Sequence, residues 1–538
     1  MTIFRQKTLA MALGLSALLL AACGGGNGGN DPDDALPDGP VDQGTVPPHT
    51  VGSPTAGRDV FQLETFGNER FWTDAVRLPA GLVSIGVTPN QLLRLGMAID
   101  VDKLPTALKT TLIADLTADG TGGTSPTLNS TANTLVLLNA NAIVGLVVKD
   151  TNGNGTLDVA SGDKVGVSCS LCHTITDGSA LQVAAGGTIG KRIDGPANFK
   201  LDFGWLASLG TNTRALYPLL QLQLAAHGNT TLGRAAAGLT EASTEAQVDA
   251  YLNDKTAYPV GMSDITFDGN GDPVRTASVF RGDLAGPYGT DGTFDKQDDF
   301  ANAVYTGVLD PTSLTTVAGR AFLNKIAGAA GGEIADDYVA VLAATGVTGY
   351  PFVTAAAAPT PGDVGTVAYP LGVRVDQTKL NDLNAYLFVL PGLSGTPSAN
   401  AKAGADVFRK SGCTDCHNVD QTRRVPSTVV AMKTIFPGDD PVVISQRTAP
   451  LSPVQNTVAS TFDDRMVVLN ASLRGSVRGV AMPLLMELGR KPAFLHDNSV
   501  ATLESLLDPA RGANAPHPFY VTDTQQKSDL ILYLKAQP

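Results

Sequence analysis

Two pentapeptides with the same pattern, Cys-x-x-Cys-His, stand far apart in this chain of 538 residues. The first begins at Cys169 and ends at His173, and the second begins at Cys413 and ends at His417. The pattern is typical of covalent haem attachment, because its two thiols can add to the two vinyl groups of one porphyrin. The adjacent histidine then becomes the proximal ligand of the iron. We therefore expect two covalently bound haem c groups, held by the thiols of Cys169, Cys172, Cys413 and Cys416 and by the imidazoles of His173 and His417.

Two other uses of a Cys-x-x-Cys pair fit this chain less well. A structural zinc site needs two such pairs folded together, or one pair and a distant pair of histidines. A thiol–disulfide centre does not need the histidine that follows each pair here. The repetition of the whole pentapeptide favours haem over both alternatives.

Residues 1–22 have the features of an export signal. They contain Arg5 and Lys7 and no acidic residue, followed by an apolar run from Leu9 to Leu20. That run is about 12 residues long, whereas a membrane-spanning helix needs about 20. We therefore predict a signal peptide and export to the compartment in which bacteria attach c-type haem.

The end of this segment, Leu20-Ala21-Ala22-Cys23, resembles the lipobox of bacterial lipoproteins. The resemblance implies that Cys23 is lipidated and anchors the protein to a membrane; a plain cleaved secretory signal is the alternative. Gly24 stands where an inner-membrane lipoprotein carries Asp, which implies a periplasmic or cell-surface lipoprotein anchored to the outer membrane. Cys23 is the fifth cysteine, so none is left for a structural disulfide.

Residues 23–55 are dense in Gly, Asn, Asp and Pro without an apolar pattern, which predicts a flexible tether. Without Arg5 and Lys7 of the signal peptide, 36 basic residues face 51 acidic ones, a net charge of −15. Such a chain lacks the basic footprint that nucleic acid requires, so we expect no nucleic-acid partner. The charge permits steering of a basic redox protein, and a small electron donor or acceptor is the other partner that we expect.

The rest of the chain contains an internal duplication. Ala56-Gly57-Arg-Asp-Val-Phe61 matches Ala403-Gly404-Ala-Asp-Val-Phe408, and Asp382-Leu-x-x-Tyr386-Leu matches Asp529-Leu-x-x-Tyr533-Leu. Each pair of segments brackets one Cys-x-x-Cys-His motif. We therefore predict two homologous cytochrome c-like haem domains, residues 56–392 and 398–538. The resemblance to cytochrome c folds implies that the Gly of the first helix lets the last, aromatic helix cross closely.

The first domain is enlarged by insertions. Cys413 follows closely after Phe408, whereas a long inserted stretch separates Cys169 from Phe61. The inserted part includes residues 93–113, whose helical apolar spacing is interrupted by Pro105. It also includes residues 135–148, an apolar run that periodicity cannot assign to helix or strand. With 58 Gly and 33 Pro, we expect a mainly α protein with long loops.

The sixth coordination position of each iron decides what the haem can do. A strong protein ligand there suits electron transfer, whereas an open position can bind peroxide or oxygen. The candidate distal ligands are the following histidines and methionines: His227, Met262, Met482, Met486, His496 and His517. Of these, His227 and Met262 are the candidates for the first haem, which otherwise stays open or water-ligated.

Part of the second domain resembles the bacterial di-haem cytochrome c peroxidases and their relatives. The matching residues are Leu473-Arg474-Gly475 and the run from Pro492 through His496 to Glu504. In that superfamily the segment lines the distal side of the C-terminal haem, and a ligating Met follows it. Residues 505–511 contain no Met, so His517, His496, Met482 and Met486 stay open as ligands. A structural role near a haem propionate is the alternative for His496.

The first domain has a decayed counterpart of this segment, Phe280-Arg281-Gly282 followed by residues 286–292, in which Thr290 takes the place of His496. Three further blocks, residues 57–72, 165–173 and 193–198, resemble a largely uncharacterised group of bacterial di-haem cytochromes. This second resemblance implies a fold and two haems, without an established reaction.

One further metal signal lies in the first domain. The residues Asp150, Asn152, Asn154 and Asp158 begin a pattern typical of calcium loops. Position twelve of the loop is Ser161 rather than Glu, so a complete EF-hand loop is not supported. An Asn/Gly turn without an ion is the alternative.

The sequence leaves two redox functions open. The first is a di-haem c-type cytochrome that transfers electrons outside the cytoplasm. The second is a di-haem oxidoreductase, peroxidase- or oxygenase-like, in which the first haem binds the oxidant. A purely structural role for two haems is the third and weakest hypothesis.

Overall fold

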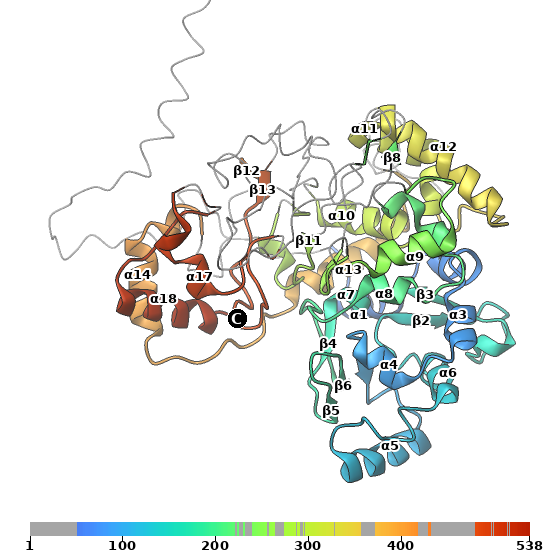
Figure 1. Cartoon of the computed structure of the whole chain (residues 1–538), viewed down its shortest axis with the longest axis horizontal. Coiled ribbons are helices and arrows are strands. Elements are labelled where there is room, and N and C mark those ends of the chain that lie inside the picture. The colour runs from blue at the N-terminus through green and yellow to red at the C-terminus, as the bar shows by residue number, and fades with distance from the viewer. Residues whose placement is uncertain are drawn as a thin grey trace, which may run out of the picture.

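The computed structural model describes 51–220, 223–224, 230–231, 239–255, 258–263, 274–286, 288–290, 294, 296–327, 329–356, 372–417, 429–431, 479–496, 498, 500–513, 515 and 517–538. The predicted signal peptide and its Cys23, nearly all of the predicted tether, and His227 lie outside these residues. We call residues 56–392 the N-terminal unit and residues 398–538 the C-terminal unit. Figure 1 shows the two units side by side, with the C-terminus between them.

Helices dominate the structure, which confirms the expected mainly α fold. The N-terminal unit contains these α-helices: α1 (Pro54–Leu63), α2 (Asn68–Arg70), α3 (Leu78–Ile85), α4 (Pro89–Arg94), α5 (Thr106–Asp119), α6 (Thr131–Asn139), α7 (Ser170–His173), α8 (Phe203–Ala207), α9 (Glu245–Asn253), α10 (Gln297–Ala303), α11 (Val317–Ala327), α12 (Ala329–Ala344) and α13 (Gln377–Val389). The C-terminal unit contains α14 (Ala401–Lys410), α17 (Leu503–Leu506) and α18 (Thr524–Ala536). In the described part, no helix is both long and apolar enough to cross a membrane.

The strands are short and form small separate sheets. One sheet has three strands in the order β1 (Ile99–Asp100), β6 (Thr188–Gly190) and β5 (Leu181–Gln182). The others are antiparallel pairs: β2 (Leu146–Lys149) with β3 (Lys164–Val167), β4 (Thr174–Thr176) with β7 (Arg192–Asp194), β8 (Gln223–Leu224) with β9 (Thr230–Thr231), β10 (Met262–Ser263) with β11 (Val274–Arg275), and β12 (Val429–Ala431) with β13 (Gly479–Ala481).

The inserted region of the N-terminal unit differs from its sequence pattern in two places. Residues 93–113 are not one interrupted helix: α4 ends at Arg94, β1 follows, and α5 begins directly after Pro105. Pro105 therefore precedes a helix, where its missing N–H costs nothing. The apolar run 135–148 contains both structures left open, because it begins inside α6 and ends in β2. Buried apolar residues lie on both elements, Leu137 and Leu138 in α6 and Val147 and Val148 in β2.

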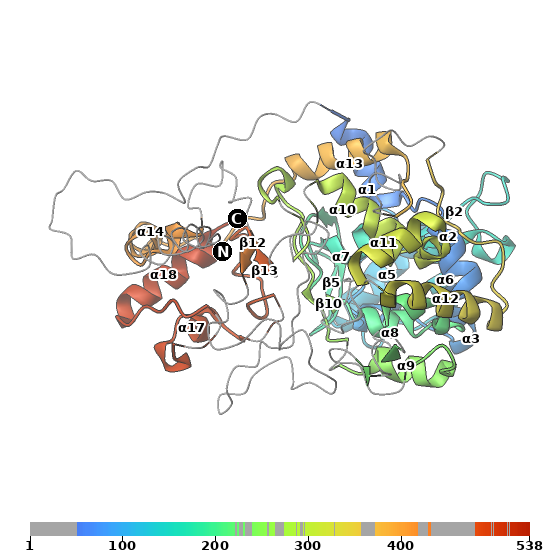
Figure 2. The same cartoon turned by 90° about the horizontal axis from the view of Figure 1, so that it is seen from above.

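The same helix crossing occurs once in each unit. Helix α1 packs against α13, and α14 packs against α18, as Figure 2 shows from above. A Cβ on Gly57 would collide with the carbonyl of Asp382, and a Cβ on Gly404 would collide with the carbonyl of Asp529. The predicted close approach at these glycines is therefore confirmed. A contact at the start of each crossing repeats too: Ser53 N–H donates to Asp382, and the Asn400 amide donates to Asp529.

The aromatic contacts of the two crossings have nearly the same geometry. The rings of Phe61 and Tyr386 lie 5.7 Å apart at 60°, and those of Phe408 and Tyr533 lie 5.8 Å apart at 59°. Two separate apolar clusters surround these pairs, one centred on the N-terminal unit and one made of C-terminal residues alone. The duplicated sequence segments thus build the same local structure twice.

A second part of the structure also repeats, in the register that aligns Tyr288 with Phe494. Tyr288 and Phe294 form an antiparallel bridge that closes a turn, and Phe494 and Val500 do the same. The same register aligns Arg281 with Glu487, and both adopt positive φ, 45° and 56°. The matching segment of the sequence comparison, residues 473–475, lies outside the described residues, so its pairing with residues 280–282 stays a prediction.

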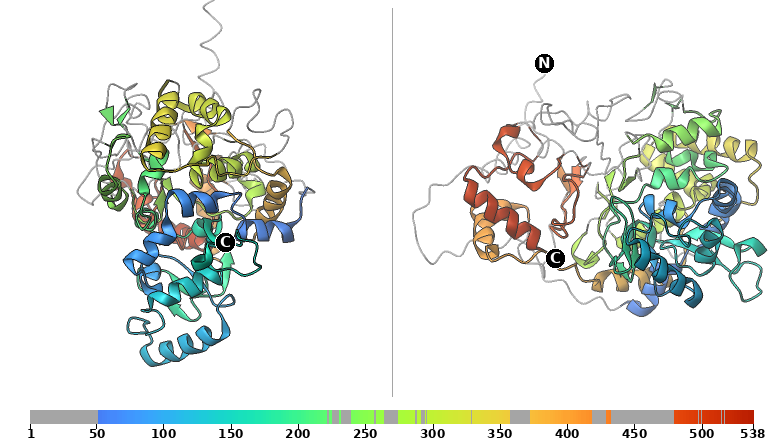
Figure 3. Two further views of the ribbon diagram at one scale, coloured as in Figure 1. Left: turned by 90° about the vertical axis from the view of Figure 1, so that its right-hand side faces the viewer. Right: turned by 60° about the horizontal axis from the view of Figure 1, so that its bottom comes forward.

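The repeated parts meet in a reciprocal contact between the units. The backbone N–H of Arg275 in β11 donates to the carbonyl of His496, at 2.8 Å. The backbone N–H of Ala481 in β13 donates to the carbonyl of Thr290, also at 2.8 Å. The repeat register aligns Arg275 with Ala481 and Thr290 with His496, so the contact has a local two-fold symmetry. The right-hand view of Figure 3 shows the C-terminal unit beside the N-terminal unit from a further direction.

Candidate functional site

The first Cys-x-x-Cys-His motif forms the short helix α7, and neighbouring segments fix it in place. The Ser168 and Ser170 hydroxyls donate to carbonyls at the end of α1, at 2.9 and 3.2 Å. The carbonyl of Cys172 accepts from Asn198 N–H at 2.8 Å, and the carbonyl of His173 accepts from Gly195 N–H at 2.9 Å. These bonds explain the sequence blocks on either side of the motif: both hold the motif's backbone.

His173 has the arrangement that a proximal iron ligand needs. Its Nδ1 donates to the carbonyl of Ala277, at 2.9 Å, which leaves the lone pair of Nε2 for a metal. Desolvation by the surrounding protein lowers the pKa of His173 to about 4, so the imidazole is neutral at pH 7. A neutral, oriented imidazole is the form that binds a metal.

The thiols of the motif are neutral rather than reactive thiolates. Desolvation raises the pKa of Cys169 to about 11 and that of Cys172 to about 12. Redox-active cysteines instead have stabilised thiolates. The desolvated environment of Cys169 and Cys172 does not favour a reactive thiolate.

Tyr305 lies beside the first motif and has no signal in the sequence. It stands in the π-helix η6 (Val304–Val308), is fully buried, and its hydroxyl lies 3.1 Å from Sγ of Cys169. Its ring packs edge-on against Phe66, at 4.6 Å between centroids. Burial and the neighbouring Cys169 raise the pKa of Tyr305 well above its usual value, so it is a neutral hydrogen-bond donor. Only the tertiary fold brings it within reach of Cys169.

The second motif follows α14 directly and begins with the 3-10 helix η8 (Cys413–Asp415). The backbone N–H of His417 donates to the carbonyl of Cys413, at 2.9 Å. Desolvation raises the pKa of the Cys413 thiol to about 11 and lowers the pKa of His417 to about 3. The His417 ring lies 6.4 Å from that of Phe408, whose helix makes the crossing.

His517 faces His417 in the C-terminal unit. The centroids of the two imidazole rings lie 6.3 Å apart. Two metal–imidazole bonds of about 2.0–2.1 Å, plus about 1.2 Å from each nitrogen to its ring centre, would span roughly 6.4–6.6 Å. The observed separation of the ring centroids, 6.3 Å, is close to this span. Burial lowers the pKa of His517 to about 4, so this imidazole is also neutral.

Both imidazoles of this pair have a buried nitrogen that lacks a hydrogen-bond partner among the described residues, Nδ1 of His417 and Nδ1 of His517. Buried polar atoms in native proteins are nearly always bonded.

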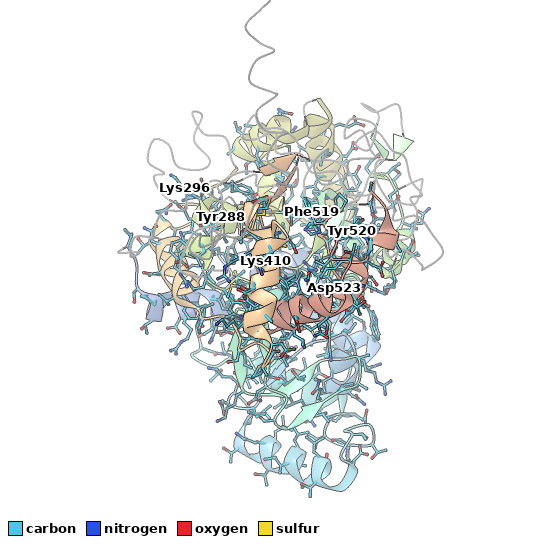
Figure 4. All side chains as sticks on the ribbon, turned by 90° about the vertical axis from the view of Figure 1, so that its left-hand side faces the viewer. Tyr288, Lys296, Lys410, Phe519, Tyr520 and Asp523 are labelled. Carbon is cyan, nitrogen blue, oxygen red and sulfur yellow. The ribbon has the colours of Figure 1, made fainter. Side chains whose placement is uncertain are left out.

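Figure 4 looks at the outer side of this unit, with Phe519 and Tyr520 near α18. The Phe519 ring packs against the His517 ring, at 5.0 Å between centroids, and helps to fix its position.

The other candidate distal ligands lie in different surroundings. Met262, in β10, pairs with Arg275 of β11. Arg275 stands two residues before Ala277, whose carbonyl accepts the hydrogen bond from His173. Met486 packs with the apolar cluster of the N-terminal unit, and its methyl group abuts Gly392. Met482 is buried just after β13, and His496 lies in the turn that contacts Arg275. His227 lies outside the described residues.

The predicted calcium loop is described in full, and its acidic side chains hold the turn. Asp150 accepts from the N–H groups of Gly153 and Gly155, at 2.7 and 2.8 Å. Asp158 accepts from Ala160 N–H at 3.1 Å and from the Ser161 hydroxyl. Within the described ranges, no group of three or more His, Cys, Asp or Glu residues is arranged to hold a metal ion. The calcium site stays a prediction, and the contacts fit the Asn/Gly turn.

Comparison with known proteins gives little further information. No family model matches the chain, and no curated protein matches it. Among solved structures, hydrazine synthase of Kuenenia stuttgartiensis, in crystals pressurised with 20 bar xenon, is similar to 51% of this chain and to 76% of that chain. The sequence identity is 16% and the TM-score is 0.24, a likeness too weak to carry an argument. Membership of the di-haem peroxidase superfamily therefore stays a prediction.

Proposed function

We propose that this protein is a di-haem c-type cytochrome that transfers electrons outside the cytoplasm. One observation carries the proposal: each Cys-x-x-Cys-His motif brings two thiols and an imidazole together beside the apolar cluster of its own unit. This donor set fits a haem c better than it fits zinc or a dithiol centre, for the reasons given above. The duplicated helix crossing beside each motif further supports two sites of one kind.

Haem supplies the redox chemistry when bound, and the chain's own residues do the rest. Cys169 and Cys172 would hold the first haem, and Cys413 and Cys416 the second. His173 and His417 are the proximal ligands in this proposal, and the Ala277 carbonyl orients the His173 ring. The fully buried Tyr305 would keep water from the edge of the first site.

We assign the distal position of the second haem to His517 in this proposal. The support is the 6.3 Å separation from His417 and the neutral state of both rings. Two imidazole ligands would close this iron to small oxidants, which suits electron transfer. Export, a lipid anchor at Cys23 and a redox partner complete the proposal as sequence-based elements.

The proposal is tested by counting covalent haems. The full chain is produced with an intact c-type haem maturation system, and its intact mass is measured. We expect two haems in the native chain, one in the Cys169→Ala/Cys172→Ala variant and one in the Cys413→Ala/Cys416→Ala variant. A native chain with the mass of the apoprotein would refute the proposal.

The alternative function is a di-haem oxidoreductase whose first haem binds the oxidant. One asymmetry favours it: His417 faces a second imidazole, whereas in the described residues His173 has no ring contact with another histidine. Thr290 also stands where the C-terminal unit has His496. Electron paramagnetic resonance separates the two functions. One high-spin haem and rapid peroxide consumption indicate the enzyme, and two low-spin haems that are inert to peroxide indicate the electron carrier.

A further inference from the structure

The carbonyl of Ala277 orients the imidazole of the first motif. It accepts the hydrogen bond from Nδ1 of His173, at 2.9 Å. An acceptor on this nitrogen orients a metal-binding imidazole and raises its basicity, so the position of the acceptor affects the ligand. The carbonyl belongs to the peptide group whose nitrogen is that of Ser278, and a peptide group is planar. A contact that fixes Ser278 therefore also fixes the direction of the Ala277 carbonyl.

The N-terminal unit holds this segment, residues 275–279, only on either side of that peptide group. The backbone N–H of Thr276 donates to the carbonyl of Gly261, at 3.2 Å, and that of Val279 donates to the carbonyl of Gly195, at 2.9 Å. Neither bond involves the peptide group that carries the Ala277 carbonyl. These two bonds therefore leave the direction of the carbonyl to other contacts.

The C-terminal unit holds the two residues that the N-terminal bonds leave out. Arg275 donates its backbone N–H to the carbonyl of His496, at 2.8 Å, and its guanidinium to the carbonyl of Ala493, at 2.6 Å. The Ser278 hydroxyl donates to the carboxylate of Glu487. Contacts from the other unit thus hold the segment both before and after Ala277.

Glu487 presents its carboxylate to Ser278 from a fixed backbone. The residue is 3% exposed, its carboxylate also pairs with Arg490, and its N–H donates to the carbonyl of Pro538, at 2.7 Å. Its φ of 56° is unfavourable for a residue with a side chain, and such a conformation persists only where the surroundings impose it. The Arg490 guanidinium in turn lies over the ring of Phe199 in the N-terminal unit, 5.6 Å from its centroid.

The bond between Ser278 and Glu487 is not repeated at the symmetric position. The repeat register aligns Ser278 with Leu484 and Glu487 with Arg281. Leu484 has no hydroxyl to donate, and Arg281 pairs with Asp283 of its own unit, at 2.8 Å. The backbone part of the contact between the units is therefore reciprocal, whereas this side-chain bond serves the first site alone.

We propose that Glu487 of the C-terminal unit is a positioning residue for the first site. Through Ser278 it fixes the Ala277 carbonyl and so strengthens the hydrogen bond that this carbonyl accepts from His173. The inference rests on the proposed function, in which His173 is the proximal ligand of the first haem. A firmly held acceptor makes the imidazole a stronger donor to iron, which favours the ferric state. The contact between the units therefore tunes the first site.

The first test needs no haem chemistry. Ser278→Ala removes the hydroxyl, and Glu487 keeps its ion pair with Arg490, so no buried charge loses its partner. We expect the amides of residues 275–279 to exchange with deuterium several-fold faster in this variant, measured by mass spectrometry on the full chain. Ser208→Ala, which removes a hydroxyl bond to the carbonyl of Trp205, is the matched control and keeps the native exchange in this segment.

The second test is a potentiometric titration of the same proteins, with two haems confirmed by mass. In Ser278→Ala we expect one of the two midpoint potentials to rise and the other to stay. The rise corresponds to a change of up to roughly tenfold in the ferric-to-ferrous ratio, which is about 59 mV for one electron. Ser278→Thr retains a hydroxyl and should restore the native potential and the native exchange. A general loosening of the fold would shift both potentials.

The outcomes separate this inference from the proposed function. Two unchanged potentials in Ser278→Ala, with two haems attached, would overturn the positioning role and leave the di-haem cytochrome intact, whether or not the exchange is faster. A native chain with fewer than two haems would overturn the proposed function itself. If Ser278→Ala fails to fold, Ser278→Val and Ser278→Thr decide, because these side chains have the same shape and only threonine can donate.

Discussion

The histidines of the two motifs, His173 and His417, differ most in the groups that lie next to their rings. His417 has His517 at 6.3 Å between ring centroids, and His173 has the Ala277 carbonyl behind its ring. Neither partner could be selected from the sequence. His517 is one of several candidate ligands there, and a backbone carbonyl leaves no trace in side-chain identity. The two thiols and the histidine of each motif are evident from their spacing alone, which is typical of haem attachment.

His517 carries the first prediction. We expect His517→Ala to convert one haem from low spin to high spin in the ferric state, because the second imidazole is lost. The measurement is the electron paramagnetic resonance spectrum of the full chain with two haems confirmed by mass. His496→Gln is the control and should keep the native spectrum. An unchanged spectrum in His517→Ala would show that another residue holds the sixth position.

Asp310 carries the second prediction. It is fully buried, and burial raises its pKa from 3.8 to about 7, although Thr312 donates its N–H and hydroxyl to one carboxylate oxygen. The folded state therefore keeps a proton that the unfolded state releases between about pH 4 and pH 7, so stability falls as the pH rises through that window. The loss amounts to at most roughly 4 kcal/mol above pH 7.

Asp310→Asn keeps the acceptor for Thr312 and removes the charge. We expect it to stabilise the protein at pH 8 relative to the native chain, by up to roughly 4 kcal/mol, and to have little effect at pH 4. Denaturant unfolding of both proteins at the two pH values measures the difference. An identical pH dependence in variant and native chain would show that Asp310 ionises normally in the folded state.

At the scale of elements, the two helix crossings are the clearest repeated feature. The glycine of α1 and that of α14 each lie against the backbone of the closing helix, and each crossing is completed by a Phe–Tyr pair. Four short matching segments predict this in the sequence. The boundaries inside the insertion are not predicted, because α6 and β2 share one apolar run. Helix and strand bury such a run equally well, so tertiary contacts decide.

The crossing glycines give the third prediction. Gly404→Ala places a Cβ against the Asp529 carbonyl and the Tyr533 side chain, neither of which can move without shifting α18. We expect a loss of about 1–3 kcal/mol or more in the free energy of unfolding. Gly332→Ala, inside α12 with only the Asn324 side chain nearby, is the matched control. It should stabilise by about 0.5–1 kcal/mol, because alanine favours the helix. Equal effects of both changes would contradict the crossing.

At the scale of the whole molecule, the two units meet through corresponding parts. Strand β11 contacts the turn that contains His496, and strand β13 contacts the turn that contains Thr290. These two contacts are related by the local two-fold symmetry of the repeat that aligns Tyr288 with Phe494. Corresponding surfaces that face each other are typical of isologous contacts between identical subunits. Here both halves belong to one chain, and two matched hydrogen bonds join them at this place.

The net charge gives the fourth prediction. With a net charge of −15 after the signal peptide, the protein should attract a cationic redox protein over long range. We expect the rate of electron exchange with such a partner to fall by roughly tenfold or more between low and physiological ionic strength, because salt screens exposed charges. Stopped-flow kinetics measure the rate. A small neutral reductant is the control and should react at a rate independent of salt, and a salt-independent rate with the cationic protein would exclude steering.

The sequence by itself determined the features that depend on local spacing. The two thiol pairs with their histidines, the duplicated crossing and the mainly helical composition all follow from short stretches of chain. Such features need no knowledge of distant contacts. The predicted export signal has the same local character and stays a prediction, because residues 1–22 lie outside the described residues.

Only the tertiary structure decided which distant groups meet. It brought His517 from a distant part of the sequence to face His417, placed Tyr305 beside Cys169, and set Ala277 behind His173. It also gave Glu487 a positive φ like that of Arg281, with which the repeat register aligns it. The features concerned are the ring of His517, the hydroxyl of Tyr305, the carbonyl of Ala277 and the backbone conformation of Glu487. Their roles arise from proximity in the folded chain, and no spacing in the sequence encodes that proximity.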